Sequence, residues 1–314
     1  MSSTFTLATS IDEAIAAMAA GATVVAGGSD LVVGHRQGKT PLPNNLVAID
    51  RIEELGRIET TDDGGLRIGA VVTHARLTED PTIVSRYSAL ADAAALVGSP
   101  STRNVGTLGG NIMNSSPAMD TGGPLAVMAA KLELQSPTGV RTVTTDQLWT
   151  GPGETSAAGD ELLIAVRLPG MAANSGSAYV RLEYRRAMEI AVVGAAAFVT
   201  LNANGTIGDM RIALTAVAPT IVSIAGMSEL SGRAIDSTLL DDVAELARAT
   251  ATPISDLRAS DSYRRHTVGV MARRAVAAAV TRAQGTPVAV PVNRSVGIGA
   301  AATTNNANNG GPTS

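Results

Sequence analysis

The chain has 314 residues, of which 45% are hydrophobic and 17% charged, so it is long enough for two globular domains with a sizeable core. A net charge of −4 and an aromatic content of 2% give no electrostatic or stacking surface for nucleic acid. The chain has no cysteine, which excludes disulfides, thiolate zinc sites, cysteine nucleophiles and cysteine-ligated iron–sulfur clusters within it, and its three scattered histidines predict no metal site.

The first elements are a helix and a strand that lead into a glycine pair. Ser10 and Glu13 have the spacing of a capping box for a helix that would end at Gly21, and residues 23–26 form a β-branched strand. Gly27 and Gly28 follow that strand and precede an apolar run, the context in which backbone N–H groups face a phosphate. The pattern is neither GxGxxG nor a P-loop, and a plain strand-to-helix turn is the alternative.

Strands are next predicted at residues 46–50 and 66–72, and a helix at 89–97. His74 follows the second of these strands, where it could face a ligand or serve as a structural hydrogen-bonding residue.

Residues 104–120 have no helical or strand period and contain three glycines and three asparagines. Glycine pairs let a backbone pass close to a ligand, and short polar side chains with free N–H groups bind anions. This stretch alone favours equally a ligand cradle and a glycine-rich connection between two lobes.

The second half of the chain changes from strands to helices. Apolar residues at 121–130 favour a helix, a hairpin is expected at 132–143, and a strand at 161–169. The small, polar residues 170–176 indicate a boundary, after which strands at 178–184, 192–201 and 206–216 precede helices at 239–249 and 263–283. This order predicts an α+β unit. From residue 284 the chain reads as a low-complexity tail, and residues 300–314 contain no large apolar residue, so we expect that part to be solvated and weakly structured.

Together, the two glycine-rich stretches resemble a known family. The motifs are Ala-Gly-Gly-Ser-Asp-Leu at 26–31, Gly-Ala-Val-Val-Thr-His at 69–74, and Arg-Asn-Val-Gly-Thr-Leu-Gly-Gly-Asn-Ile at 103–112, with Ser-Pro-Ala-Met-Asp at 116–120 behind them. At this spacing, and over residues 4–283, the chain resembles the FAD-binding medium subunit of the molybdenum hydroxylases, which include xanthine dehydrogenase, aldehyde oxidoreductase and carbon monoxide dehydrogenase.

The resemblance implies an α+β protein in three parts. Residues 1–175 would be a two-lobe FAD-binding domain of the vanillyl-alcohol-oxidase (PCMH) type, with lobes at about 1–55 and 56–175. Residues 176–283 would be a C-terminal α+β domain with a small sheet and helices, and 284–314 the tail.

The resemblance also implies a set of cofactor-binding residues and no catalytic or metal-binding residue. The loops at 26–31 and 107–111 would hold the FAD diphosphate through backbone N–H groups and short side chains, Asp120 would lie near the ribityl chain, and Arg185 would face the flavin or be a surface arginine. The full set is Val25, Ala26, Gly27, Gly28, Ser29, Asp30, Leu31, Thr73, His74, Thr102, Gly106, Thr107, Gly109, Gly110, Asn111, Asn114, Asp120, Leu162, Leu163 and Arg185.

As a family member, the chain would relay electrons. A large subunit with a molybdenum pterin cofactor and a small subunit with two [2Fe–2S] clusters would be its partners, in a dimer of heterotrimers. Its FAD would pass electrons to NAD, a quinone, a carrier protein or O2. A stand-alone FAD-dependent oxidoreductase of the same fold is the alternative. Without a signal peptide or an apolar run of membrane length, we expect a cytoplasmic chain, which partners could also hold at a membrane surface.

Overall fold

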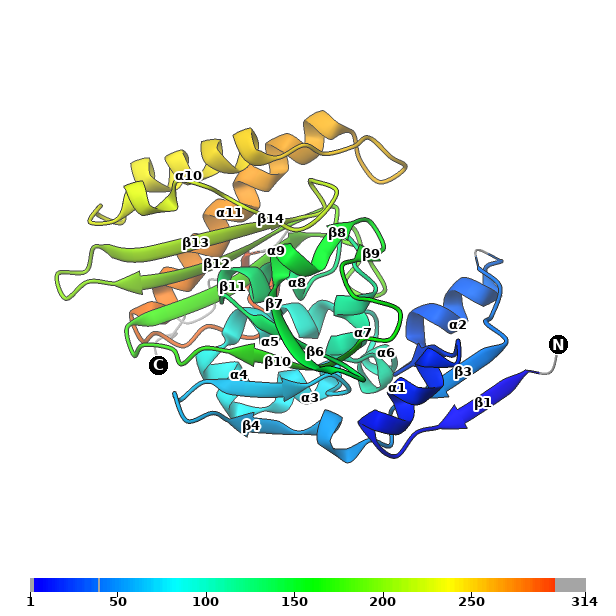
Figure 1. Cartoon of the computed structure of the whole chain (residues 1–314). Coiled ribbons are helices and arrows are strands. Elements are labelled where there is room, and N and C mark those ends of the chain that lie inside the picture. Colours follow the sequence, from blue (N-terminus) through cyan, green and yellow to red (C-terminus); the bar gives the residue numbers. More distant parts are fainter. Residues whose placement is uncertain (1–2, 39, 297–314) are drawn as a thin grey trace, which may run out of the picture.

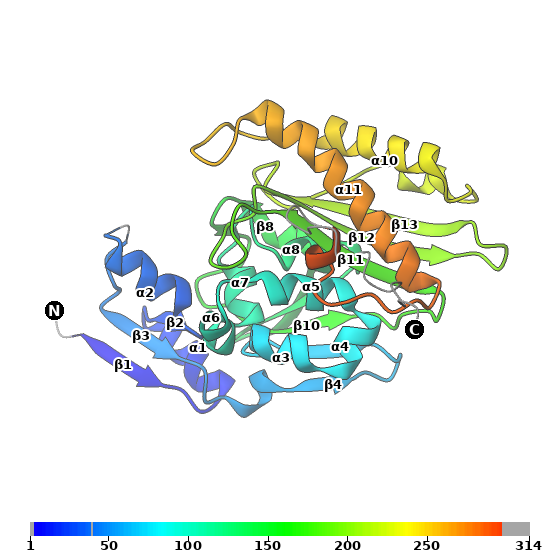
Figure 2. The same cartoon turned by 180° about the vertical axis from the view of Figure 1, so that it is seen from behind.

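The computed structural model describes residues 3–38 and 40–296 (Figure 1). The chain begins with a parallel three-stranded sheet in the order β1-β3-β2. Its elements are β1 (Thr4–Leu7), α1 (Ile11–Ala19), β2 (Thr23–Val25), α2 (Ser29–Arg36) and β3 (Asn45–Ala48). This lobe lies at one end of the molecule (Figures 1 and 2).

The start of α1 follows the expected capping pattern with one shift. The Ser10 hydroxyl accepts from the Glu13 amide at 3.2 Å, whereas the Glu13 carboxylate accepts from the Thr9 amide at 2.8 Å instead of that of Ser10. Behind this cap, the buried side chains Ile11 and Ile15 join a core cluster of the first lobe.

A five-stranded antiparallel sheet follows, in the order β4-β5-β10-β6-β7. Its strands are β4 (Ile58–Thr60), β5 (Leu66–Gly69), β6 (Lys131–Ser136), β7 (Gly139–Thr144) and β10 (Leu162–Leu168). Strand β10 is buried on both faces: Leu162 and Ile164 join the first-lobe cluster, while Leu163 and Val166 join the central core. This strand therefore holds the two lobes together.

Short helices fill the space between this sheet and the next one (Figures 1 and 2). They are α3 (His74–Glu79), α4 (Pro81–Arg86), α5 (Ser88–Leu96), α6 (Pro100–Val105), α7 (Leu108–Met113) and α8 (Gly122–Val127), and η1 (Glu53–Gly56), α9 (Thr145–Leu148), β8 (Trp149–Gly151) and β9 (Glu154–Thr155) lie in the connections. Helix α7 lies within residues 104–120, the stretch that shows no helical period in the sequence. The Thr107 hydroxyl caps α7 by accepting from the Gly110 amide at 3.0 Å, and six residues are too few to show a helical period.

The C-terminal part is a four-stranded antiparallel sheet covered on both faces. Its elements are β11 (Ser175–Leu182), β12 (Val193–Leu201), β13 (Ile207–Thr215), β14 (Val222–Ser223), η2 (Met227–Leu230), α10 (Ser237–Thr250) and α11 (Asp261–Ala283). Ala196 and Phe198 pack into the central core, while Ala195 and Ala197 pack into the cluster shared with α11. A Cβ on Gly176 would overlap the Ala279 carbonyl, so this glycine lets α11 approach the sheet closely.

The segment expected to be a tail from residue 284 starts as part of the fold. Val292 is fully buried and donates its amide to Asp92 at 2.9 Å. Asn293, the first residue of α12 (Asn293–Val296), accepts from the Arg181 amide at 2.7 Å. The tail assignment is thus wrong for these residues, whose few apolar and amide groups meet partners about a hundred or more positions earlier. The remainder of the expected tail, 297–314, lies outside the described residues.

Candidate functional site

The turn after β2 lies directly against the connection between α6 and α7. A Cβ on Gly27 would overlap the Val105 carbonyl oxygen and lie 2.5 Å from its carbonyl carbon. Only glycine permits two backbones to approach so closely. The two glycine-rich stretches, about eighty residues apart in the sequence, therefore meet in space.

A third segment joins them through backbone hydrogen bonds. The His74 amide donates to the Gly106 oxygen at 3.0 Å, and the Leu108 amide donates to the Val72 oxygen at 2.9 Å. Thr73 and Thr107 face each other in an isolated antiparallel bridge. A Cβ on Gly106 would lie 3.4 Å from His74 Cδ2 and 3.5 Å from Ser29 Oγ. We call the region where residues 26–30, 70–74 and 105–111 meet the loop junction.

Helix α2 offers an anion site at the loop junction. The first turn of a helix leaves N–H groups without intrahelical partners, and Gly28, the residue before the helix, has no side chain to cap them. Gly28 has a φ of 64°, a left-handed conformation that glycine adopts without strain. The amides of Ser29, Asp30 and Leu31, with the helix dipole behind them, fit a diphosphate without any lysine.

The second loop contributes less than its sequence suggests. The amides of Leu108, Gly109 and Gly110 donate to Val72 O, Ala70 O and Thr107 Oγ1, and the Asn111 amide donates to Thr107 O. The expectation that this loop binds phosphate through these N–H groups is corrected, because in this conformation they already have acceptors. What it presents at the junction is the Thr107 hydroxyl and the exposed, side-chain-free backbone of Gly110.

His74 lies inside the loop junction as the first residue of α3, and Thr73 caps that helix by accepting from the Arg76 amide at 3.3 Å. The His74 side chain is 2% exposed, and its Nδ1 has no hydrogen-bond partner among the described residues. Burial, with a further contribution from the charge of Arg103, lowers the pKa of His74 to about 4. The imidazole is therefore neutral at physiological pH.

Asp120 points away from the junction, towards the C-terminal sheet. Its carboxylate accepts from Arg181 Nη1 at 2.6 Å and from the Tyr179 hydroxyl at 2.8 Å. Burial raises the pKa of the Asp120 carboxyl, and the charge of Arg181 opposes that rise. Asp120 is expected near a ribityl chain, but both of its carboxylate oxygens already accept hydrogen bonds from Tyr179 and Arg181 in the C-terminal sheet. The expected role is corrected to that extent. Neither Arg181 nor Tyr179 is among the site residues expected from the sequence, although an arginine within an apolar strand is a signal of a buried partner.

The other expected site residues lie around the junction or apart from it. Val25 ends β2 and Ala26 follows it in the turn, and Thr102 contacts the Met188 sulfur at 3.7 Å. Asn111 Oδ1 accepts from Thr121 at 2.6 Å, and Asn114 follows α7 in an exposed position. Leu162 and Leu163 are core side chains on opposite faces of β10, so only their backbone could meet a ligand.

Arg185 is an exposed side chain of the loop after β11. Its Nε lies 3.1 Å from the Glu189 carboxylate, and its Nη2 donates to the Met188 oxygen at 2.7 Å. The loop itself touches α6, since the Met188 sulfur lies 3.7 Å from Thr102 Oγ1, and its amide donates to Gly98 O, just before the helix, at 3.1 Å. Arg185 is thus near α6 but engaged within its own loop.

Neither a metal centre nor a membrane helix is present in the part of the chain that the structure describes. No group of three or more His, Asp or Glu residues in residues 3–38 and 40–296 could hold a metal ion. No helix in these residues combines the length and the apolar character that a bilayer requires.

The uncapped α2 and the close approach of Gly27 to Val105, at one end of the chain's two lobes, are the features of a dinucleotide-binding protein. Residues 1–171 match the family model described as the FAD binding domain in molybdopterin dehydrogenase, and residues 178–279 match the CO dehydrogenase flavoprotein C-terminal domain. The chain belongs to this family, the FAD-binding subunits of the molybdopterin dehydrogenases. The family, its α+β fold, FAD as cofactor and membership of an oxidoreductase class are thereby confirmed.

Relatives match over nearly the whole chain. The xanthine dehydrogenase FAD-binding subunit of Escherichia coli O157:H7 is 34% identical over 84% of this chain and 90% of its own length. The carbon monoxide dehydrogenase medium chain of Hydrogenophaga pseudoflava is 33% identical over 87% of this chain and 95% of its own length. A solved structure of carbon monoxide dehydrogenase from Hydrogenophaga pseudoflava superposes with a TM-score of 0.85, 31% identity, and coverage of 90% and 98%. The structure of quinoline 2-oxidoreductase from Pseudomonas putida 86 superposes with a TM-score of 0.83 and 28% identity, and the match covers 91% of this chain and 98% of that chain.

Proposed function

We propose that this chain is the FAD-carrying electron-transfer subunit of a molybdenum hydroxylase complex. Its partners are a large subunit with a molybdenum pterin cofactor and a small subunit with two [2Fe–2S] clusters, arranged as a dimer of heterotrimers in the cytoplasm. The names of the relatives support separate partner chains, since they include a "medium chain" and a "complex subunit alpha". The observation that carries the proposal is the loop junction, where Gly27 meets Val105 beside the uncapped start of α2.

The residues of the junction divide the work of holding FAD. The amides of Ser29, Asp30 and Leu31 bind the diphosphate, and Thr107 and Gly110 line its other side. The His74 amide donates to the Gly106 oxygen, and the His74 ring lies beside the Gly106 backbone, so His74 holds this part of the junction in place. We assign residues 1–175 to FAD binding and 176–283 to the C-terminal domain, which the family matches over 1–171 and 178–279 support. Residues 284–296 pack against both parts.

Bound FAD supplies the redox chemistry, because it can accept electrons singly and release them as a pair. The chain supplies position and a fixed electrostatic environment. His74 is buried and neutral and adds no charge beside the diphosphate. Electrons would arrive from the [2Fe–2S] clusters of the small subunit and leave to NAD, a quinone, a carrier protein or O2.

The test begins with the native complex. Purified complex should contain FAD in extractable form, at one equivalent per copy of this chain, and two other protein chains. A purified chain with no extractable flavin would overturn the proposal. FAD with no companion chain would support the stand-alone oxidoreductase instead.

Gly110→Val tests whether FAD lies at the loop junction. Gly110 is exposed, and a Cβ there would meet only Thr107 Oγ1 at 3.0 Å. We expect the variant to fold and to lose most of its FAD, because a β-branched side chain would block approach to the backbone. Gly159→Val is the matched control, since a Cβ at Gly159 meets no atom within 4 Å. Full flavin occupancy in Gly110→Val would place the diphosphate elsewhere.

A further inference from the structure

His74 is a buried side chain whose two ring nitrogens have different surroundings. Nδ1 is fully enclosed and has no hydrogen-bond partner among the described residues. Nε2 is not enclosed in this way, although the side chain as a whole is only 2% exposed, and no described residue forms a hydrogen bond with it. A ligand can therefore reach a nitrogen of this ring only at Nε2.

The Nε2 edge of the ring faces the start of α2. Cδ2, the carbon bonded to Nε2, lies 3.4 Å from the position of a Cβ on Gly106, and Ser29 Oγ lies 3.5 Å from the same point. Ser29 is the first residue of α2, where the backbone amides have no intrahelical partner. Nδ1 occupies the opposite edge of the imidazole. The reachable nitrogen is thus on the side of the ring where the diphosphate is proposed to bind.

The proton of the neutral ring belongs on Nε2. Burial, with a smaller contribution from the charge of Arg103, lowers the pKa of His74 to about 4, so at neutral pH the ring has one N–H and one unprotonated nitrogen. An N–H at Nδ1 would be enclosed without an acceptor, which is rare in proteins, whereas an N–H at Nε2 can meet water or a ligand. His74 therefore presents a hydrogen-bond donor to the loop junction.

Packing alone does not account for a histidine at this position. An enclosed polar atom without a partner costs stability, and an apolar ring of similar size would fill the space without that cost. The backbone hydrogen bond from the His74 amide to the Gly106 oxygen, at 3.0 Å, is available to any residue except proline. What histidine adds is the N–H on Nε2.

We propose that His74 binds FAD directly, by donating its Nε2–H to an oxygen of the diphosphate that the α2 amides hold. The inference rests on the proposed function, because it requires FAD at the loop junction. A neutral N–H adds a donor to the amides of α2 without placing a charge in the interior. The ring thereby has a role of its own, separate from the hydrogen bond that the His74 amide gives to Gly106.

Three substitutions at His74 separate the two nitrogens. Glutamine places an N–H close to the position of Nε2, asparagine places one close to Nδ1, and phenylalanine removes both nitrogens but keeps a ring. When each deflavinated chain is titrated with FAD, His74→Gln should bind within about threefold of the wild type, whereas His74→Asn and His74→Phe should bind about tenfold more weakly or worse. His266→Phe makes the same change at an exposed histidine of α11 and should bind like the wild type.

Melting temperatures of the flavin-free chains separate folding from binding. His74→Phe removes the unpartnered Nδ1, so its flavin-free chain should melt at the wild-type temperature or above it while it binds FAD weakly. Equal affinities of His74→Gln and His74→Phe, whether both strong or both weak, would overturn the proposal, because only the glutamine keeps a donor near Nε2.

Nitrogen NMR spectroscopy of the wild-type chain observes the ring directly. The His74 signals, identified by their loss in His74→Phe, should show the Nε2–H form, and FAD should shift the Nε2 signal until one equivalent is bound. An Nδ1–H form would overturn the proposal. If Gly110→Val loses FAD but the His74 variants all bind like the wild type, only the role of the ring is wrong. Full flavin occupancy in Gly110→Val would instead overturn the proposed site, and this inference with it.

Discussion

Arg181 and Asp120 form a buried ion pair between the two halves of the chain. The distance from Nη1 to Oδ2 is 2.6 Å, and the Arg181 side chain is fully buried. Glu183 lies on the other side of the guanidinium at 2.8 Å, and Tyr179 completes the hydrogen bonds of Asp120. The pair joins the segment that follows the second glycine loop to the first strand of the C-terminal sheet, so it couples the FAD domain to the rest of the chain.

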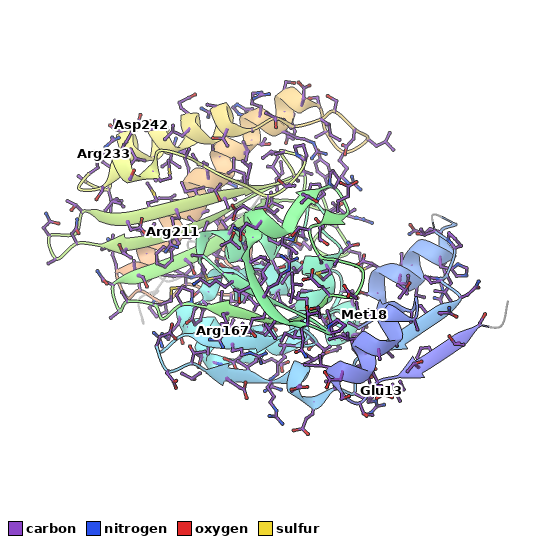
Figure 3. All side chains as sticks on the ribbon, in the orientation of Figure 1. Glu13, Met18, Arg167, Arg211, Arg233 and Asp242 are labelled. Atoms are coloured by element: carbon purple, nitrogen blue, oxygen red, sulfur yellow. The ribbon has the colours of Figure 1, made fainter. Side chains whose placement is uncertain are left out.

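Arg181→Met should destabilise the fold strongly. Removal of one partner of a buried pair leaves the other charge uncompensated and costs about 3–5 kcal/mol of unfolding free energy. Urea denaturation measures the change. Arg233→Met is the control: its partner Asp242 is 2.5 Å away but half-exposed, at the end of the C-terminal sheet far from α1 (Figure 3), and loss of such a pair costs less than about 1 kcal/mol. Similar costs for the two variants would contradict the interpretation.

Gly27→Ala should weaken FAD binding by at least about tenfold, or 1.4 kcal/mol. The added methyl group overlaps the Val105 carbonyl, so the two loops of the junction must separate. Titration of the deflavinated chain with FAD gives the affinity. Gly159→Ala adds the same methyl group in open space and should bind like the wild type. Wild-type affinity in Gly27→Ala would mean that the approach of the loops is irrelevant to FAD.

His74 makes stability depend on pH. Its folded-state pKa of about 4 lies below the ordinary value of 6.5, so the unfolded chain binds the proton first as the pH falls. Stability due to the neutral ring is complete above pH 6.5 and lost between 6.5 and 4. Between pH 7 and 5 the wild type should lose about 2 kcal/mol that His74→Gln does not lose. His35→Gln, at an exposed histidine, should retain the wild-type profile. Parallel profiles for wild type and His74→Gln would refute this prediction.

Trp149, the single tryptophan, should report FAD occupancy. Its indole N–H donates to the Ile112 oxygen at 3.1 Å, near the end of α7, and the first residue of α7 adjoins the loop junction. Six residues of helix span about 9 Å, so bound flavin lies close enough to quench the indole. Removal of FAD should raise Trp149 emission, and titration should reverse the rise at one equivalent. If Trp149 emission does not change when FAD is removed or added, the flavin binds far from α7.

The glycine motifs and most regular elements could be predicted from the sequence because their signals are local. The strand before Gly27 and the cap at Ser10 are set by neighbours within a few residues. The contact of Gly27 with Val105 and the pairing of Asp120 with Arg181 arise from tertiary packing, which no local pattern encodes. Helix α7 is hard to predict from the sequence for another reason. Its six residues include two glycines, and a single threonine hydroxyl caps its start.

The place of the segment after residue 284 in the fold is hard to predict from the sequence for a similar reason. Residues 284–296 mix valines with proline, glycine and polar residues and show no periodicity, and their place in the fold comes from a few specific contacts to Asp92 and Arg181. The composition of a segment indicates how much surface it can bury. It does not indicate whether one of its amides is the hydrogen-bond donor to a buried carboxylate elsewhere in the chain, as that of Val292 is to Asp92.

Asp92 has a consequence for biosynthesis. This buried residue of α5 accepts from Arg282 at 2.6 Å and from the Val292 amide at 2.9 Å, partners 190 and 200 positions later in the chain. The N-terminal domain leaves the ribosome first, but its Asp92 carboxylate stays without these donors until residue 292 has emerged. The buried carboxylate of the FAD domain therefore gains its full set of donors only when residues up to 292 can fold with it.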